Sequence, residues 1–116
     1  MSESSDAGPC WDIQQARNLY NIQRWGAGYF DINEAGHVIA KPQRDDGASV
    51  DLTDVIEEAR ARGLRFPVLV RFQDILRHRV EHINKAFRNA IAEFDYKGQY
   101  QGVFPIKVNQ LREVVE

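Results

Sequence analysis

The chain has 116 residues, enough for one small domain, with 43% hydrophobic and 28% charged residues, as in soluble globular proteins. Its 15 basic and 17 acidic side chains give a net charge of -2, so nothing in the charge balance favours nucleic acid or an anionic membrane as a partner. There is no apolar run of membrane-spanning length, no signal-peptide pattern and a single cysteine, Cys10, which together predict a reducing, cytoplasmic location.

Residues 1–10 are small, polar and turn-forming, which predicts a disordered tail. Asp12 can cap a helix, and Gln15 stands three residues later as a capping-box partner. Apolar residues then recur at helical spacing as far as Trp25, and Gly26 is expected to end this first helix.

Apolar and polar residues alternate on both sides of a turn within residues 29–40, which predicts a β-hairpin. The turn falls at residues 33–36, where Gly36 is free to take a positive φ. Residues 42–49 are predicted to form a polar loop. Asp51 then begins a helix with one apolar stripe, and Gly63 ends it.

The second half of the sequence has a strand–helix–strand pattern. Residues 68–72, VLVRF, are a short apolar run typical of a strand covered on both faces. Residues 74–94 are predicted to be a helix, residues 100–109 a second strand, and residues 111–116 the start of another helix. One apolar stripe runs along the long helix: Leu76, Val80, Ile83, Phe87, Ile91 and Phe94.

This order predicts a βαβ unit with parallel strands. One unit leaves its sheet edges open, so we expect the beginning of a larger α/β domain that is interrupted after its second strand. The predicted organisation is a tail at residues 1–10, an N-terminal part at residues 11–65, and the start of the α/β domain at residues 66–116.

Lys107 is the candidate catalytic residue. It lies in the apolar stretch VFPIKVN, near the C-terminal end of its predicted strand, where α/β barrels place their active sites. Burial favours the neutral amine that Schiff-base chemistry requires. The alternative is an edge-strand lysine facing water, which the residues alone favour. Pro105 predicts a local irregularity, because a proline removes one donor from the sheet.

The segment HRVEH, residues 78–82, fits the H-x-x-E-H pattern of a class of zinc metallopeptidases. His78 and His82 could share a metal ion, with Glu81 as general base. The helical phase places all three side chains opposite the apolar stripe, which favours a solvated helix face instead. Arg71, near the end of the first predicted strand, could bind an anion or pair with a carboxylate.

Three segments together carry a resemblance to a known family: WGAGYF at residues 25–30, PVLVRF at residues 67–72 and FPIKVNQ at residues 104–110. Over residues 11–116 the chain resembles the N-terminal region of the biosynthetic, polyamine-pathway arginine decarboxylases. The third segment is similar to the aromatic-x-aliphatic-Lys-x-Asn motif that holds the cofactor lysine in alanine racemase-like decarboxylases dependent on pyridoxal 5'-phosphate (PLP).

The resemblance implies an α/β fold, in which an N-terminal helix and β-hairpin precede the first βαβ unit of a truncated PLP-binding (α/β)8 barrel. The hairpin would contribute to a β-rich domain. Lys107 is implied as the lysine that carries PLP. The expected reaction converts L-arginine to agmatine and carbon dioxide for putrescine and spermidine synthesis. PLP and Mg²⁺ are the expected cofactors, and a homo-oligomer is the expected active form.

A complete barrel needs about 250 residues. The resemblance therefore implies that the phosphate-binding loops, the acidic partner of the ring nitrogen and the substrate-selecting residues fall outside this sequence. We expect the isolated chain to be inactive. Two alternatives remain open, an inactive remnant or small binding module, and a zinc metallopeptidase built on residues 78–82.

Overall fold

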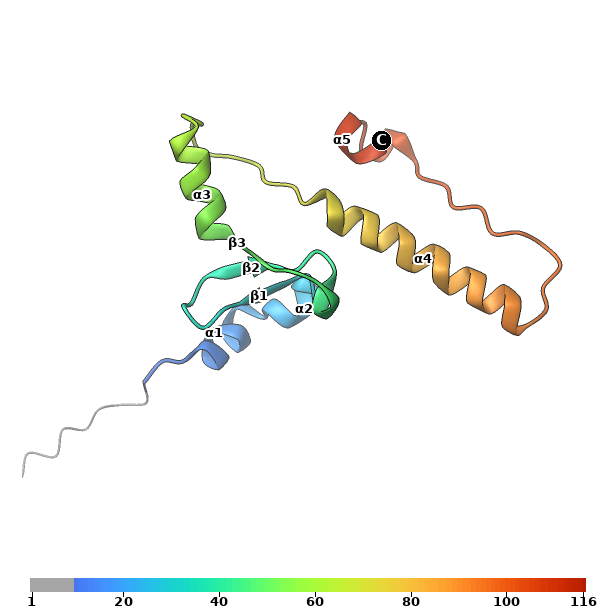
Figure 1. Cartoon of the computed structure of the whole chain (residues 1–116), viewed down its shortest axis with the longest axis horizontal. Coiled ribbons are helices and arrows are strands. Elements are labelled where there is room, and N and C mark those ends of the chain that lie inside the picture. The colour runs from blue at the N-terminus through green and yellow to red at the C-terminus, as the bar shows by residue number, and fades with distance from the viewer. Residues whose placement is uncertain (1–9) are drawn as a thin grey trace, which may run out of the picture. The chain divides into compact units, whose positions relative to one another are not determined.

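The computed structural model describes residues 10–116, so all but the last residue of the predicted tail lies outside the described residues. Cys10, that last residue, is exposed and forms no disulfide. The chain divides into two compact units, Met1–Phe66 and Pro67–Glu116, which are described separately. Figure 1 shows the elements of each unit in chain order.

Two short helices open the first unit, where the sequence predicted one: α1 (Ile13–Tyr20) and α2 (Ile22–Gly26). The predicted capping box is confirmed, because Asp12 Oδ1 accepts from the Gln15 N–H at 2.7 Å and Gln15 Oε1 accepts from the Asp12 N–H at 2.9 Å. The helices are separated at Asn21, whose φ of 53° is left-handed. Asparagine tolerates this conformation better than most residues, and the helical periodicity alone does not reveal it.

A three-stranded antiparallel sheet follows, with strand order β1-β2-β3. The predicted hairpin is confirmed: β1 (Phe30–Ile32) pairs with β2 (Val38–Ala40), with Asp31 opposite Ile39, and Gly36 in the turn has a φ of 83°. The third strand, β3 (Val50–Asp51), was not predicted. Two residues are too few to show an alternating pattern, and β3 forms only because the second edge of β2 is free to pair with it.

The helix predicted after the sheet is α3 (Leu52–Ala61), and Asp51 caps it by accepting from the Thr53 N–H at 2.8 Å. The helices α1 and α2 pack against β1, while α3 contacts β2 and β3 (Figure 1). The hydrophobic core of the described residues lies in this first unit and centres on Ile22, which is 1% exposed. The core residues are Ala16, Ile22, Tyr29, Ile32 and Ala40.

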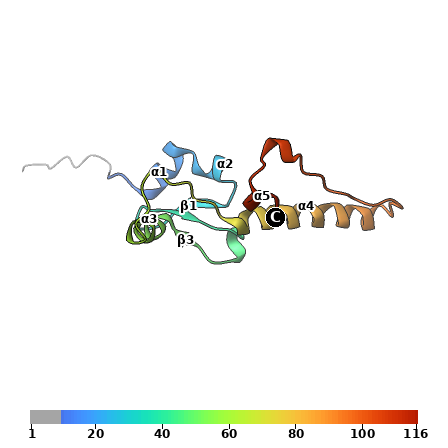
Figure 2. The ribbon, with the colours of Figure 1, turned by 90° about the horizontal axis from the view of Figure 1, so that it is seen from above.

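The second unit is dominated by the predicted long helix, α4 (Gln73–Glu93), and also contains the short helix α5 (Arg112–Val115). Residues 95–111, named here the return segment, run back along α4 (Figure 2). The Tyr100 ring stacks on the Phe87 ring with centroids 4.0 Å apart, and the Gln73 side-chain amide donates to the Glu113 carbonyl oxygen. Both ends of α4 are therefore in contact with the chain that follows it.

Neither strand predicted for the second unit forms as a strand. Residues 68–72 are irregular, and residues 100–109 are irregular apart from a 3-10 turn at Ile106–Val108. An extended segment becomes a strand only when a neighbour pairs with its backbone donors and acceptors, and within residues 67–116 no such neighbour is present. The apolar residues of these two segments, among them Leu69 and Val103, are exposed.

None of the helices within residues 10–116 is both long enough and apolar enough to cross a membrane.

Candidate functional site

Lys107 lies in the middle of the 3-10 turn Ile106–Val108. Two hydrogen bonds close this turn: the Val108 N–H donates to the Pro105 carbonyl oxygen at 3.0 Å, and the Asn109 N–H donates to the Ile106 carbonyl oxygen at 3.1 Å. The turn begins directly after Pro105. Because no strand forms in this segment, the irregularity that Pro105 was expected to cause within a strand stays a prediction. The backbone of Lys107 is thus fixed from both sides.

The Lys107 side chain is exposed, and it makes no hydrogen bond or ion pair with another described residue. Its apolar neighbours Phe104, Ile106 and Val108 are also exposed, by 51%, 54% and 74%. In an extended strand, alternate side chains would point to opposite faces. The segment forms a turn instead, so these side chains do not alternate between two faces. Residues 10–116 therefore place a free primary amine in an apolar stretch and do not enclose it.

PLP needs a lysine amine for its covalent bond, together with anion-binding groups for its phosphate and a partner for its ring nitrogen. The turn supplies the first of these, because the Lys107 amine is exposed and free of a partner among the described residues. The side chains next to it in sequence are apolar apart from Asn109. This part of the chain supplies an exposed primary amine, the kind of group to which PLP attaches.

The structure does not bring the other predicted site residues to Lys107. Arg71 is exposed in the irregular segment before α4. His78 and His82 belong to α4, and their rings stack on each other with centroids 6.2 Å apart. Glu81 and His82 are exposed. Catalytic zinc takes three protein ligands, yet no three His, Cys, Asp or Glu side chains gather within residues 10–116. The metallopeptidase hypothesis gains no support from the described residues.

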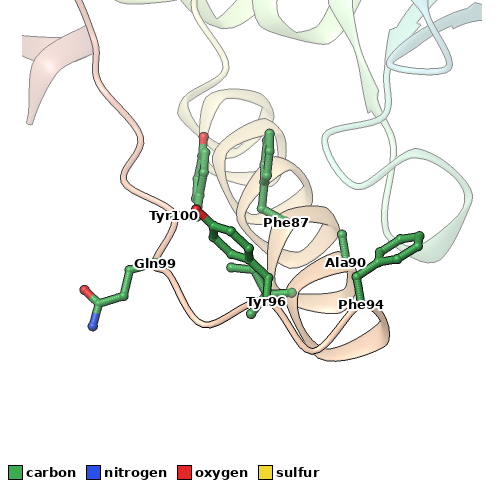
Figure 3. A pocket seen from close by; sticks show the side chains of 7 residues that line it. Phe87, Ala90, Phe94, Tyr96, Gln99 and Tyr100 are labelled. Atoms are coloured by element: carbon green, nitrogen blue, oxygen red, sulfur yellow. The ribbon is translucent and has the colours of Figure 1, made fainter.

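An apolar hollow opens where the return segment leaves α4, and sequence reasoning did not identify it (Figure 3). The segment turns at Asp95, whose φ is 48°, and so brings aromatic rings back over the end of α4. The hollow is lined by Phe87, Ala90, Ile91, Phe94, Tyr96, Gln99 and Tyr100. Lys107 is not among these residues, and the lining supplies apolar contact without a charged group. The clustered aromatic residues were the only sequence signal for it.

A polar cluster in the first unit joins the hairpin turn to α3, and it too was missed. Asp51 Oδ2 lies 2.8 Å from His37 Nδ1 and accepts from the Asn33 amide at 3.0 Å, while Asp51 Oδ1 accepts from the Thr53 N–H. The hydrogen bond with His37 is the largest influence, and with the Thr53 and Asn33 donors it holds the pKa of Asp51 below its usual value despite burial. This cluster serves the local fold, since its groups satisfy one another.

A second charged pair joins α1 to β1. The Arg17 guanidinium donates to Asp31 Oδ1 at 2.8 Å and to the Ile32 carbonyl oxygen at 2.8 Å. Burial alone would raise the pKa of Asp31, but the Ile32 N–H and the Arg17 guanidinium outweigh it and lower that pKa. Every bond of this pair lies inside the first unit, so its role is also structural.

Comparison with known proteins gives three representative relatives, all named biosynthetic arginine decarboxylase. The protein from Parasynechococcus marenigrum (strain WH8102) is 50% identical over 106 residues, which cover 91% of this chain and 16% of that protein. The protein from Prochlorococcus marinus (strain MIT 9303) is 44% identical over 115 residues, 99% of this chain and 18% of the relative. The protein from Alkalilimnicola ehrlichii is 51% identical over 107 residues, 91% of this chain and 17% of the relative.

No protein-family model matches the chain. The chain spans 16% to 18% of the length of the three relatives, while almost all of its own residues take part in the match. Identities of 44% to 51% over more than 100 residues reflect common descent, and the predicted resemblance is confirmed. The chain therefore belongs to the biosynthetic arginine decarboxylase family and corresponds to a segment of its members.

Proposed function

We propose that this chain is the segment of a PLP-dependent arginine decarboxylase that carries the cofactor lysine, and that this lysine is Lys107. The observation that carries the proposal is the identity of 44% to 51%, across at least 91% of the chain, with proteins named biosynthetic arginine decarboxylase. The motif FPIKVN, which resembles the cofactor-lysine motif of alanine racemase-like PLP decarboxylases, supports the assignment of the residue. The complete enzyme would convert L-arginine to agmatine and carbon dioxide.

We propose further that residues 66–116 become the first βαβ unit of a barrel when neighbouring strands are present. Two features of the second unit support this. The return segment runs antiparallel to α4, as the strand after the helix does in a crossover connection (Figure 2). The apolar runs on both sides of α4 have exposed side chains, including Leu69 and Val103, that a packed sheet would bury.

The chemistry assigned to this chain is limited to one side chain. Bound PLP supplies a ring that accepts the electrons left behind when the substrate carboxylate departs as carbon dioxide. Lys107 Nζ binds the cofactor covalently, and it assists proton transfer and product release once it is freed. Both tasks require the neutral amine, so a pocket that excludes water around the turn would favour them by disfavouring the ammonium ion.

Several properties of the complete enzyme remain part of the proposal. They are a requirement for Mg²⁺, a homo-oligomeric active form, a role in putrescine and spermidine synthesis, and a cytoplasmic location. They rest on membership of the family and on nothing in the geometry of residues 10–116. The same reasoning leads us to propose that the 116-residue chain alone is inactive, because it corresponds to only 16% to 18% of the length of the relatives.

An activity assay tests this proposal. Agmatine and carbon dioxide would be measured with L-arginine and PLP, for the protein produced from its own gene and for the 116-residue chain alone. We expect turnover by the former, none by the latter, and loss of turnover in Lys107→Arg. Lys97→Arg is the matched control, because Lys97 is an exposed lysine of the return segment that pairs with Asp95. Full turnover by Lys107→Arg would contradict the assignment.

A further inference from the structure

The side chain that follows the lysine turn has a specific contact of its own. Asn109 Oδ1 accepts a hydrogen bond from the Leu111 N–H at 3.2 Å, just before α5 begins. The Asn109 backbone N–H donates to the Ile106 carbonyl oxygen, on the other side of Lys107. One residue thus closes the turn with its backbone and fixes the start of the next segment with its side chain.

The backbone conformation does not explain why asparagine stands here. Asparagine is often favoured because it tolerates a left-handed φ, but Asn109 has a φ of -149° and a ψ of 107°, which any residue adopts. Asparagine is one of the residues whose short side chain carries an oxygen that reaches the backbone N–H two residues later. Asn109 is also half-buried, while the three residues of the turn before it are exposed.

We propose that Asn109 is a positioning residue for Lys107, acting through the hydrogen bond from its side-chain oxygen to the Leu111 N–H. This inference rests on the proposed function, because positioning matters only if Lys107 carries PLP. Pro105 restrains the chain before Lys107 through its fixed φ, and Asn109 restrains the chain after it. Without the Asn109 bond, the segment that carries Lys107 can rotate relative to α5, whether it forms this turn or the strand proposed for the complete enzyme, and the Lys107 amine samples more directions.

The contact itself is tested by hydrogen exchange at the Leu111 amide, in the protein produced from its own gene. Asn109→Ala removes the acceptor, and Asn109→Asp retains it at the same distance along the side chain. One lost hydrogen bond corresponds to roughly a three- to tenfold change in the local opening equilibrium. We expect exchange to accelerate by that factor in Asn109→Ala and to stay near the wild-type rate in Asn109→Asp.

The consequence for Lys107 is tested by capture of PLP. The protein is incubated with limiting PLP and reduced with borohydride, and the modified Lys107 peptide is quantified by mass spectrometry. We expect the PLP concentration needed for half-maximal capture to rise roughly three- to tenfold in Asn109→Ala and to recover in Asn109→Asp. Asn84→Ala is the matched control, because Asn84 is a half-buried asparagine of the same unit that donates to the Val80 carbonyl oxygen.

Rescue by aspartate separates positioning from a general loss of folding, which would lower capture in both variants and in the control. Wild-type capture by Asn109→Ala would overturn the inference, as would an Asn109→Asp protein that captures no better than Asn109→Ala. Failure of the proposed function has a different signature. In that case the wild-type protein captures no PLP on Lys107, whatever stands at position 109, and the inference falls with it.

Discussion

At the scale of single residues, Asp51 links two parts of the first unit. It caps α3 and also binds the hairpin turn through His37 and Asn33. Its lowered pKa means that the folded state prefers the ionised carboxylate more strongly than the unfolded state does. The stability that it contributes is therefore fully present above the unfolded pKa of about 3.9 and is lost as the pH falls through the lower folded value.

The lowered pKa of Asp51 predicts that the first unit becomes less stable in acid. Its free energy of unfolding can be measured by urea unfolding followed by tryptophan fluorescence, because Trp11 and Trp25 both lie in this unit. We expect stability to fall below about pH 4, and Asp51→Asn to be less stable at pH 7 and to lose less on acidification. Asp31 has a lowered pKa as well, so part of the acid loss remains.

Asp45→Asn is the control for this titration, because the Asp45 side chain is 90% exposed. It should unfold as the wild type does across the whole pH range. An Asp51→Asn protein that shows the full acid loss of the wild type would contradict the account of this carboxylate.

The sequence indicated Lys107 as a candidate residue, but it did not indicate the partners of Asp51. Lys107 stands in a contiguous motif, which can be read without knowing the fold. His37 and Asn33 are 14 and 18 residues from Asp51 in the chain, and they meet it only because β2 pairs with both of its neighbours. Nothing in their local sequence indicates this pairing. Contacts that depend on tertiary geometry were therefore beyond sequence reasoning here.

At the scale of elements, the predictions succeeded where a pattern was long or capped. The helix α4 was predicted within one residue of Gln73–Glu93, because six apolar residues repeat along it. The capping box of α1 was likewise visible in the sequence, and the start of α3 was predicted within one residue. The break at Asn21 and the two-residue strand β3 depend on one left-handed residue and on pairing with β2, and neither leaves a periodic signal.

The pair α1–α2 provides a direct test of the core. Ile22 is 1% exposed, and its truncation in Ile22→Ala should cost about 2 to 4 kcal/mol of unfolding free energy, because a cavity adds to the lost burial. Leu19→Ala is the matched control, since Leu19 belongs to the same helix pair and is 65% exposed. We expect it to change stability by less than about 0.5 kcal/mol. Equal losses in urea unfolding would show that the core is placed wrongly.

At the scale of the whole chain, burial differs between the two units. All the buried hydrophobic residues described lie in the first unit, whereas most of the apolar stripe of α4 and of the segments beside it is exposed. The exposed residues include Leu76, Val80, Ile83, Phe87 and Phe94. An apolar surface of this extent is unusual for a soluble monomer and marks a surface that associates.

We therefore expect the purified 116-residue chain to self-associate and to bind a hydrophobic dye. Light scattering and dye fluorescence measure the two properties. Phe94→Gln should reduce dye binding, because the Phe94 side chain is 77% exposed, and Lys85→Gln serves as a control at an exposed polar position of α4. A monodisperse chain without dye binding would show that the stripe is covered in solution.

The central claim is that Lys107 carries PLP, and borohydride reduction tests it most directly. The protein produced from its own gene would be reduced in the presence of PLP and digested, and every lysine peptide would be examined for the added mass of the cofactor. The account predicts a single modified peptide containing Lys107, and no modified peptide in Lys107→Arg. Cofactor found on a different lysine, or on none, would contradict it.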